Sequence, residues 1–392
     1  MARKMKDSGI EWIGEIPEGW EVTKLKYLST FPIEKNARTD SPYIGLENIE
    51  SWTGKYVSSD SQYDKSQALA FFENNILFGK LRPYLAKVFC ASNDGCCSSE
   101  FCILNFSSSV NIRYFWNLLI SPTFIDHVTK STYGTKMPRA NTDFIKNICV
   151  PVPPRIEQDR IALYLDATSA KIDSLISETR SSIEEYKKLK QAVITQAVTK
   201  GVRGEREMKD SGVEWIGEIP AAWDVAKAKY CVTITHGSDP KTEGSIPVYG
   251  SGAESFKTCG EYKEGPTVLI GRKGATLHIP HYIEGKYWNV DTAFDVKAKN
   301  NFSLPYYYYL ATSFDYKFYI AQTTLPGMTQ SNYYNMFLPF PTFPEQEEIV
   351  NYLDAKCAEI DKLIAKKEQL VKELESYKKS LIYEVVTGKR EV

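Results

Sequence analysis

The chain has 392 residues, 43% of them hydrophobic and 13% aromatic, which suits two or three packed domains and excludes a disordered chain. No stretch approaches the roughly eighteen apolar residues of a membrane span, and the N-terminal residues lack the apolar run of a signal peptide, so we expect a cytoplasmic protein. The net charge of −1 excludes a uniformly basic nucleic-acid binder, so any basic surface has to be local.

The chain begins with a segment that recurs past its middle. Residues 5–22 (MKDSGIEWIGEIPEGWEV) and 208–225 (MKDSGVEWIGEIPAAWDV) are identical at 14 of 18 positions, and the second copy starts 203 residues after the first (208 − 5). The two copies contain four tryptophans: Trp12, Trp20, Trp215 and Trp223. We expect them to be packing anchors, because a tryptophan in a repeated framework more often packs than stacks on a base.

The similarity continues along the chain. Residues 76–80 match 268–272 at an offset of 192 (268 − 76), and the Tyr-Leu-Asp-Ala of 164–167 returns at 352–355 at an offset of 188 (352 − 164). Such a pattern indicates two copies of one unit, each with a repeated segment, a divergent domain and a similar tail. Similar flanks around divergent centres predict one framework that carries two specificities.

The divergent centres contain strand and helix patterns. Runs of β-branched and aromatic residues between turn signals predict strands, for example at 102–106 and 267–270. One helix in each half is expected near 111–121 and 303–313. The two centres are therefore predicted to be mixed α/β domains.

Each half ends in a predicted long helix, the first over residues 156–199. Positions seven apart form a stripe in each tail: Leu165, Ile172, Thr179, Tyr186 and Val193, then Leu353, Ile360, Lys367, Leu374 and Leu381. Further apolar residues fill the adjacent positions: Leu175, Ile176, Ile183 and Leu189, then Leu363, Ile364, Leu370 and Val371. Gly201 and Gly388 are expected to end the helices.

Each stripe needs a partner, and the most accessible partner is the other tail. We expect an antiparallel coiled coil of two helices, with one domain at each end and approximate two-fold symmetry. At 1.5 Å per residue the predicted first helix would be roughly 65 Å long.

Three features together resemble specificity subunits of Type I restriction–modification systems. They are the repeated WIGEIPxxW, the helix entries VPVPPRIEQ and LPFPTFPEQ, and the helix ends AVTKG and VVTGK. The resemblance covers essentially the whole chain, with small departures such as Phe343 where the first copy has Arg155. It implies an α/β (α+β) fold class in which a pair of long antiparallel helices separates two target recognition domains.

The resemblance divides the chain into four segments. They are 1–153 for the first repeat segment and recognition domain, 154–207 for the central helix and linker, 208–341 for the second repeat segment and domain, and 342–392 for the C-terminal helix.

The resemblance also implies a non-catalytic role. Each recognition domain would read one half of a bipartite, asymmetric site in double-stranded DNA, and the helices would set the gap between the halves. Two methyltransferase subunits would dock on the repeated regions, and restriction subunits would join them. S-adenosylmethionine, ATP and Mg would belong to those partner subunits, with no cofactor in this chain and no membrane partner.

The candidate DNA contacts are polar or basic residues at matching places in both halves. Lys80 and Arg82 follow a predicted buried strand, and Arg272 and Lys273 follow its counterpart. Polar loops before the helix entries, and the ends of neighbouring strands, supply the other candidates: Thr135, Lys136, Arg139, Asn141, Ser99, Thr292, Thr324, Thr329 and Gln330. A solvated basic turn is the structural alternative for the loops of Lys80 and Arg272, and a purely structural turn is the alternative for the polar loops before the helix entries.

Two other functions stay open at this point. One is a structural coiled-coil adaptor that binds no DNA. A stand-alone nuclease would need Asp239, Glu261 and Lys263, a loose pattern that the first half does not share. No phosphate-binding loop and no methyltransferase tetrapeptide is present.

The cysteines and histidines show no metal-site or disulfide spacing. The eight cysteines form no CxxC pair and are expected to be reduced thiols. His278 and His281 lack further ligands at zinc-site spacing, so we expect no metal.

Overall fold

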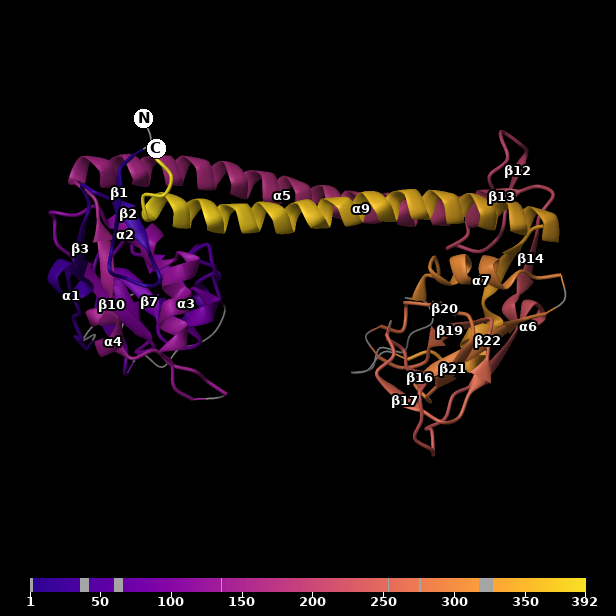
Figure 1. The fold of residues 1–392 in the computed structure, drawn as a ribbon. Coiled ribbons are helices and arrows are strands. Elements are labelled where there is room, and N and C mark those ends of the chain that lie inside the picture. The colour runs from indigo at the N-terminus through magenta and orange to yellow at the C-terminus, as the bar shows by residue number, and fades with distance from the viewer. Residues whose placement is uncertain are drawn as a thin grey trace. The chain divides into compact units, whose positions relative to one another are not determined.

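The computed structural model describes residues 3–35, 42–59, 66–134, 136–252, 254–274, 276–299, 301–316 and 327–392. The chain folds into two compact units (Figure 1). Unit 1 comprises Met1–Thr179 and Gln369–Val392, and unit 2 comprises Arg180–Glu368. Each unit holds one globular domain, called domain 1 or domain 2, and one stretch of each long helix. The four-segment division predicted from the sequence stays a prediction.

Domain 1 is a mixed α/β domain with two larger sheets and two pairs of strands among its described residues. A β1–β2 hairpin precedes strand β3, which pairs antiparallel with β11, and the sheets have the strand orders β4-β10-β7-β8 and β5-β9-β6. The strands are β1 (Met5–Asp7), β2 (Glu15–Pro17), β3 (Glu21–Lys24), β4 (Ser29–Thr30), β5 (Tyr43–Ile44), β6 (Leu69–Phe71), β7 (Ile76–Gly79), β8 (Val88–Cys90), β9 (Gly95–Cys97), β10 (Phe101–Phe106) and β11 (Cys149–Val152). The helices are α1 (Leu25–Leu28), α2 (Ile112–Leu119), α3 (Pro122–Lys130) and α4 (Thr142–Asn147).

Domain 2 repeats this plan. The β12–β13 hairpin and the β14–β23 pair correspond to β1–β2 and β3–β11, and the sheets have the orders β15-β22-β19-β20 and β17-β16-β21-β18. The strands are β12 (Met208–Asp210), β13 (Glu218–Pro220), β14 (Asp224–Lys227), β15 (Val232–His236), β16 (Ile246–Tyr249), β17 (Lys257–Cys259), β18 (Lys263–Glu264), β19 (Thr267–Gly271), β20 (His281–Ile283), β21 (Lys286–Asn289), β22 (Ala293–Ala298) and β23 (Phe337–Phe340). The helices are α6 (Ala228–Cys231), α7 (Leu304–Ala311) and α8 (Gln330–Asn335).

The predicted domain elements are present with small differences in their ends. The strand predicted at 102–106 is β10, and the strand predicted at 267–270 is β19. The helix predicted over 111–121 ends at Leu119, because Pro122 has no amide hydrogen to continue it and instead starts α3 from Ser121. The helix predicted over 303–313 is α7, with the Ser303 hydroxyl capping its first turn.

The two long helices are α5 (Arg155–Lys200) and α9 (Phe343–Val386). The helix predicted over 156–199 therefore extends by one residue at each end. Gly201 follows α5 with φ 75° and Gly388 follows α9 with φ 72°, in the left-handed region that glycine adopts without steric cost. Both glycines are the predicted helix stops.

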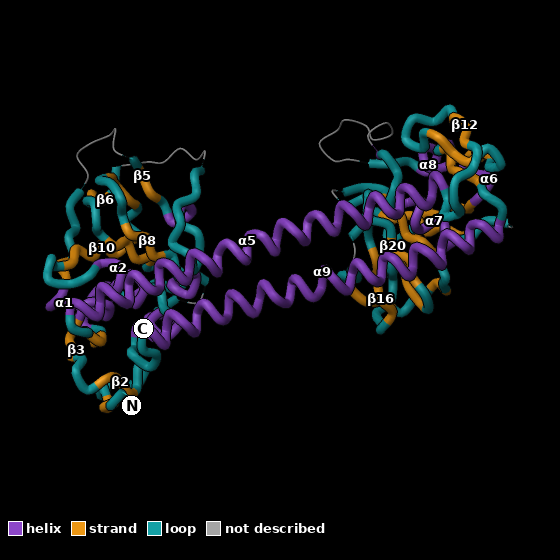
Figure 2. Tube along the Cα trace, turned by 90° about the horizontal axis from the view of Figure 1, so that it is seen from above, coloured by secondary structure: helices purple, strands orange, loops and turns teal. Residues whose placement is uncertain are grey.

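Within each unit the stretches of α5 and α9 lie side by side and run antiparallel (Figures 1 and 2). In unit 2, Lys190 pairs with Asp361, and Arg203, just past the end of α5, pairs with Glu348 nearer the start of α9. In unit 1, Asp173 pairs with Lys378 at 2.7 Å. Of the stripe residues, Leu165, Ile172, Leu353, Ile360 and Leu381 are buried, while Tyr186, Val193 and Leu374 are partly buried.

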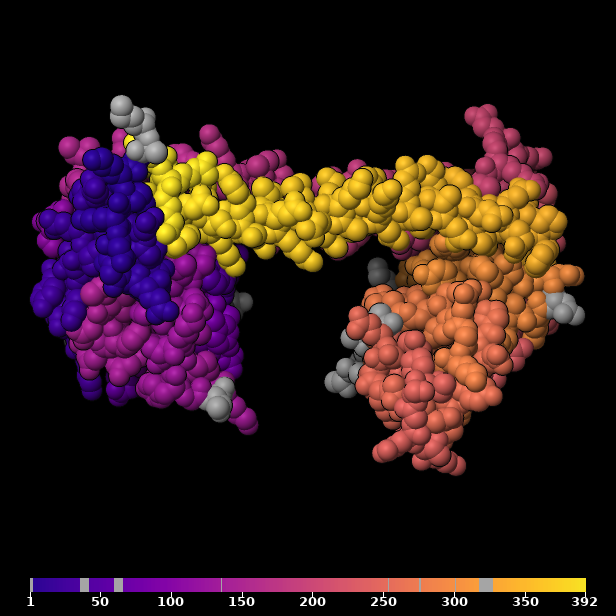
Figure 3. Space-filling model, viewed as in Figure 1, coloured from indigo at the N-terminus to yellow at the C-terminus, as the bar shows by residue number. Residues whose placement is uncertain are grey.

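The apolar residues that flank the stripe differ in their burial. Ile176, Ile183 and Val371 are buried, but four leucines and Tyr377 lie on the outside: Leu175, Leu189, Leu363 and Leu370 are 50%, 49%, 36% and 43% exposed, and Tyr377 is 47% exposed. A two-helix pair covers only one narrow seam on each helix, so the second apolar stripe stays uncovered. The space-filling view shows α9 without a covering element along the side turned to the viewer in each unit (Figure 3).

All eight cysteines are free thiols. In the described part of the chain, the helices lack the combination of length and apolar character that crossing a membrane requires.

Candidate nucleic-acid interface

The structure brings two of the predicted loops of domain 1 together. Lys80 directly follows β7, and its amide donates to the carbonyl of Glu100 at 2.8 Å, while the amide of Ala140 donates to the Lys80 carbonyl at 2.9 Å. The Arg82 amide donates to the carbonyl of Pro138 at 2.7 Å. The segments 80–82 and 138–140, distant in sequence, therefore form one surface, which we call loop pair 1.

The two arginines of loop pair 1 differ in their side-chain contacts. Arg139 forms an ion pair with Glu100 at 2.5 Å. Arg82 is exposed, and no described residue accepts a hydrogen bond from its guanidinium or forms an ion pair with it. Lys80 is half-buried, and Lys136 and Ser99 are exposed nearby in the sequence. Thr135 lies outside the described residues.

Domain 2 builds the same arrangement. The Arg272 amide donates to the carbonyl of Thr292 at 2.8 Å, and the amide of Met328 donates to the Arg272 carbonyl at 2.9 Å. Lys273 bridges to Gly327. These are the counterparts of the hydrogen bonds around Lys80, so the segments 272–274 and 327–328 form loop pair 2.

Loop pair 2 has its own side chains. Arg272 donates to the backbone carbonyl of Asp291 at 3.1 Å and lies 3.5 Å from its carboxylate, whereas Lys273 is exposed. Thr292 is half-buried and contributes its carbonyl to the loop. Thr324 lies outside the described residues.

Three other candidates have structural tasks. Asn141 caps α4 by accepting from the amide of Asp143 at 2.7 Å, and Thr329 caps α8 by accepting from the amide of Asn332 at 3.0 Å. The Gln330 amide group donates to the carbonyl of Ile234 at 2.6 Å. Their part in DNA contact stays a prediction, and their side chains are already engaged in the fold.

The repeated segment docks each domain on a helix start. In unit 1, the Trp20 indole donates to the carboxylate of Glu157 at 2.9 Å, and Arg3 pairs with the same carboxylate at 2.5 Å. Burial acts to raise the pKa of Glu157, but the hydrogen bonds from Arg3 and Trp20 outweigh it and hold that pKa below its usual range. Trp20 is buried, as expected of a packing anchor.

Unit 2 repeats this docking atom for atom. The Trp223 indole donates to Glu345 at 2.8 Å, and Arg206 pairs with Glu345 at 2.5 Å. Arg206 lies over the Trp223 ring as Arg3 lies over Trp20, at 5.1 and 5.4 Å from the ring centroids.

A buried glutamine and a buried tyrosine complete the junction in each unit. The Gln158 side chain accepts from the amide of Asn111 at 2.8 Å, and Gln346 accepts from the amide of Ser303 at 2.7 Å. Hydroxyls of two tyrosines reach the ends of the long helices: Tyr114 donates to Val386 at 2.9 Å, and Tyr306 donates to Val198 at 3.0 Å. Each domain is thus held on both long helices by the same set of contacts.

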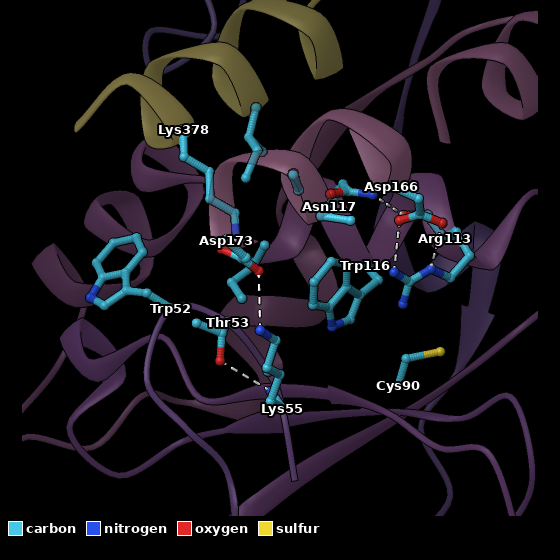
Figure 4. Close-up of a pocket in the computed structure, with 15 residues that line it drawn as sticks. Trp52, Thr53, Lys55, Cys90, Arg113, Trp116, Asn117, Asp166, Asp173 and Lys378 are labelled. Atoms are coloured by element: carbon cyan, nitrogen blue, oxygen red, sulfur yellow. Dashed lines mark hydrogen bonds and ion pairs between the residues drawn. The ribbon is translucent and has the colours of Figure 1, made fainter. Parts of the chain in front are cut away.

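A pocket of about 270 Å³ lies in unit 1 between domain 1 and the helices. Figure 4 shows Lys55 and Lys378 reaching Asp173, and Arg113 reaching Asp166. Unit 2 has a pocket of about 550 Å³ lined by the repeat-related positions. The correspondences include Trp116/Tyr308, Asp166/Asp354, Asp173/Asp361, Lys378/Lys190 and Ile382/Ile194.

The carboxylates of both pockets already have partners. Besides the ion pairs of unit 1, Asp354 accepts from the Tyr309 hydroxyl at 2.6 Å and Asp361 pairs with Lys190 at 2.7 Å. These pockets are therefore part of the domain–helix junction.

The residues of the nuclease alternative have separate structural roles. Glu261 accepts from the Thr242 hydroxyl and from the amide of Lys241, both at 2.7 Å. These hydrogen bonds, the one from Thr242 first, lower the pKa of Glu261 to about 2. The carboxylate therefore closes the loop that follows Asp239.

Lys263 belongs to a different network inside domain 2. Its ammonium donates to Asn289 at 2.7 Å and to the buried Asp295 at 3.3 Å. Among the residues that the structure describes, no group of three or more His, Cys, Asp and Glu side chains is placed to hold a metal ion. The nuclease alternative is not favoured.

A family model described as Type I restriction modification DNA specificity domain matches residues 17–185 and 223–373. Three curated relatives are specificity subunits of Type I restriction enzymes. EcoDI of Escherichia coli is 26% identical over 211 residues, 52% of this chain and 45% of the relative. MjaVIII of Methanocaldococcus jannaschii is 28% identical over 233 residues, 57% of this chain and 51% of the relative. The putative MjaX subunit of the same organism is 25% identical over 423 residues, 96% of this chain and 95% of the relative.

The chain spans about half the length of the first two of these relatives. Two solved structures share its fold. A chain from a study of complex assembly and conformational transition of the type I R-M system has a TM-score of 0.78 at 17% identity, covering 96% of this chain and 99% of that one. The HsdS subunit from Thermoanaerobacter tengcongensis has a TM-score of 0.55 at 19% identity, covering 96% and 98%.

Proposed function

The chain belongs to the Type I restriction modification DNA specificity domain family, and from this premise we propose that it is the DNA-reading, non-catalytic subunit of such a system. Domain 1 reads one half of a bipartite, asymmetric site in double-stranded DNA, and domain 2 reads the other half. The long helices set the gap between the halves.

The proposal rests on the similarity of loop pair 1 in domain 1 and loop pair 2 in domain 2. The same backbone hydrogen bonds hold segments 80–82 and 272–274 at the same place in two domains, but the side chains there differ. A shared backbone with exchanged side chains is what two readers of different base sequences need, since base edges are read by side chains and the backbone only positions them.

The interiors of the two domains support different specificities as well. Asp295 on β22 is buried and accepts from Thr267 at 2.5 Å and from Tyr287 at 2.7 Å, whereas the repeat-related position in domain 1 is the apolar Ile103. A buried charge network at a position where the other domain has an apolar side chain indicates that the two centres have diverged beyond their surfaces.

The uncovered stripe on the long helices supports a docking role. Leu175 and Tyr377 in unit 1, and Leu189 and Leu363 in unit 2, are apolar side chains on the long helices that are 36–50% exposed. We assign this stripe to methyltransferase subunits, one on each unit, because a partner that binds both repeats meets equivalent positions twice. S-adenosylmethionine, ATP and Mg would be bound by the methyltransferase and restriction subunits.

Methylation mapping tests the reading function directly. Deleting the gene is expected to remove N6-methyladenine from one interrupted genomic sequence, and exchanging residues 223–340 for a related domain is expected to change one half of it. The same exchange of residues 20–152, the counterparts by the repeat (223 − 203 and 340 − 188), is the matched control and should change the other half. An unchanged map after deletion would contradict the proposal and would favour a coiled-coil adaptor without DNA binding, which gel-shift measurements in moderate salt then check.

The spacing role has a separate test. Inserting seven residues after Ser182 and seven after Gln369 keeps the heptad seam of both helices in register. The insertion is expected to lengthen the gap by about three base pairs, since seven residues add about 10 Å of helix and each base pair about 3.4 Å. A methylated sequence with a changed half-site and an unchanged gap would contradict the spacing role of the helices. Inserting seven residues in α5 alone is the control and should disrupt the helix pairing.

A further inference from the structure

Arg82 stands at an unusual place in the backbone of loop pair 1. Its φ is 50° and its ψ is 60°, the left-handed conformation that brings the Cβ of an L-residue close to the following carbonyl oxygen. Arginine is exposed here and has no described partner, so neither an ion pair nor a side-chain hydrogen bond accounts for its presence.

The repeat shows what this position demands. Arg82 is the third residue after β7, and Gly274 is the third residue after β19. Gly274 has φ 117°, also in the positive region. Both loop pairs therefore bend at this point, and domain 2 uses the residue that suits the bend while domain 1 uses an arginine that does not.

The backbone around Arg82 is held on both sides. Its amide donates to Pro138 at 2.7 Å, its carbonyl accepts from the amide of Leu85 at 2.9 Å, and the buried Pro83 follows it. The guanidinium therefore starts from a fixed backbone, whereas the side chain of Arg139 is tied to Glu100. Strain that the surroundings enforce at an exposed side chain is characteristic of functional positions.

We propose that Arg82 reads a guanine in the half-site recognised by domain 1, by donating two hydrogen bonds to the O6 and N7 atoms of that base in the major groove. A planar guanidinium matches those two acceptors, and reading a base edge requires a fixed starting point that a phosphate contact does not. Domain 2 has no such reader at Gly274. The inference rests on the proposed function and assigns a specificity residue within it.

Selection from a library of duplexes with randomised sequence tests this inference on the full chain. Wild-type protein is expected to enrich one interrupted sequence. Arg82→Gly is expected to lose the preference for G·C at one position of one half-site, with about tenfold to hundredfold weaker binding of the wild-type sequence and no change in the other half. Its thermal stability should not fall, because glycine suits the backbone at this position.

Asn74→Gly is the matched control. Asn74 has φ 67°, is exposed, and precedes the start of β7, whereas Arg82 follows the end of that strand. Both substitutions remove the same kind of strain in the same domain. Arg82→Gly is expected to alter the selected sequence and Asn74→Gly is not. Arg82→Lys should weaken the preference for guanine, because an ammonium lacks the planar pair of N–H donors that a guanidinium offers.

Two results would overturn the inference. One is an unchanged selected sequence with Arg82→Gly. The other is weaker binding that is equal for all sequences and comes with a shallower salt dependence, which indicates a phosphate contact. If the wild-type chain enriches no sequence at all, the proposed function itself fails, and the two failures are thus distinguished.

Discussion

Asp173 on α5 forms an ion pair with Lys378 on α9 at 2.7 Å, and the internal repeat reproduces this pair in unit 2. There Asp361 on α9 pairs with Lys190 on α5, also at 2.7 Å. The offset of 188 relates both members (361 − 173 and 378 − 190). In unit 1, α5 therefore supplies the aspartate and α9 the lysine, and in unit 2 the two helices exchange these roles. Lys190 lies seven residues after the buried Ile183, and Lys378 lies seven after the buried Val371. A polar residue on such a seam selects one register of helix pairing at some cost in stability.

The two copies of this ion pair are expected to contribute unequally to stability. The side chains of Asp173 and Lys378 are 22% and 15% exposed, against 55% and 30% for Asp361 and Lys190. Lys378→Ala should therefore lower the free energy of unfolding by about 2 kcal/mol, because it leaves a shielded carboxylate with only Lys55. Lys190→Ala should cost less than about 1 kcal/mol. Urea titrations of both variants check this, and equal losses would contradict it.

The indole of Trp223 is expected to matter more than that of its neighbour Trp215. Trp223→Phe removes the donor to the buried Glu345 and should lower the free energy of unfolding by about 3 kcal/mol. The Nε1 atom of Trp215 is buried without a hydrogen-bond partner among the described residues, so Trp215→Phe loses ring contacts and no hydrogen bond. Thermal unfolding compares the two. A larger loss for Trp215→Phe would mean that the Glu345 contact is not the anchor.

Trp52 is expected to hold its loop against α9. The Lys379 ammonium lies 4.0 Å from the centroid of the Trp52 ring, and the Trp52 amide donates to Ala86 at 3.2 Å. Trp52→Ala should speed amide hydrogen exchange in residues 50–57, because a cation over a tryptophan ring contributes about 1 kcal/mol. Lys379→Met tests the cation alone and should give part of this effect. Unchanged amide hydrogen exchange in both variants would show that the segment Pro83–Ala86 holds the loop without the contact between Trp52 and Lys379.

Asp295 predicts how domain 2 responds to acid. Burial acts to raise the pKa of Asp295, but hydrogen bonds from Thr267 and Tyr287 and the charge of Lys263 outweigh it, so the pKa lies below its ordinary value of 3.8. The charged form thus stabilises the fold fully above pH 3.8, and this contribution is lost as the pH falls through the lowered pKa.

Asp295→Asn gives the measurement for this prediction. At neutral pH the variant should lose about 3 kcal/mol, because Lys263 and two hydroxyls lose a charged acceptor. The difference from wild type should shrink as the pH falls below about 3.8, since asparagine does not titrate. Unfolding followed by tyrosine and tryptophan fluorescence across this range checks it. A difference that stays constant with pH would show that the Asp295 charge does not stabilise domain 2.

Local patterns carried much of the fold. The seven-residue spacing from Leu165 to Val193 predicted a long helix there, and α5 extends one residue beyond the predicted range of 156–199 at each end. The glycine stops at Gly201 and Gly388 were equally local, since only the backbone at those positions decides the end of the helix. The repeat of Trp20 and Trp223 predicted a packing role, and both side chains are buried.

Contacts between distant segments were not predictable in this way. The sequence places Lys80 and Arg139 in separate loops, and only the sheet and the bridge at Leu81 join them into loop pair 1. Leu175 and Leu189 satisfy the apolar pattern as well as Ile176 and Ile183 do, yet they are exposed, because periodicity identifies an apolar stripe without saying what covers it.

The sequence by itself determined the duplicated plan of this protein, its two long helices and its family, because each depends on residue identity and spacing along the chain. The tertiary structure decided which residues meet: the indoles of Trp20 and Trp223 with the carboxylates at the helix starts, and Asp173 with Lys378. It also showed that Arg82 occupies a left-handed bend that its counterpart Gly274 shares. Backbone dihedral angles and contacts across more than a hundred residues arise only when the chain is folded, and these features therefore appear only in three dimensions.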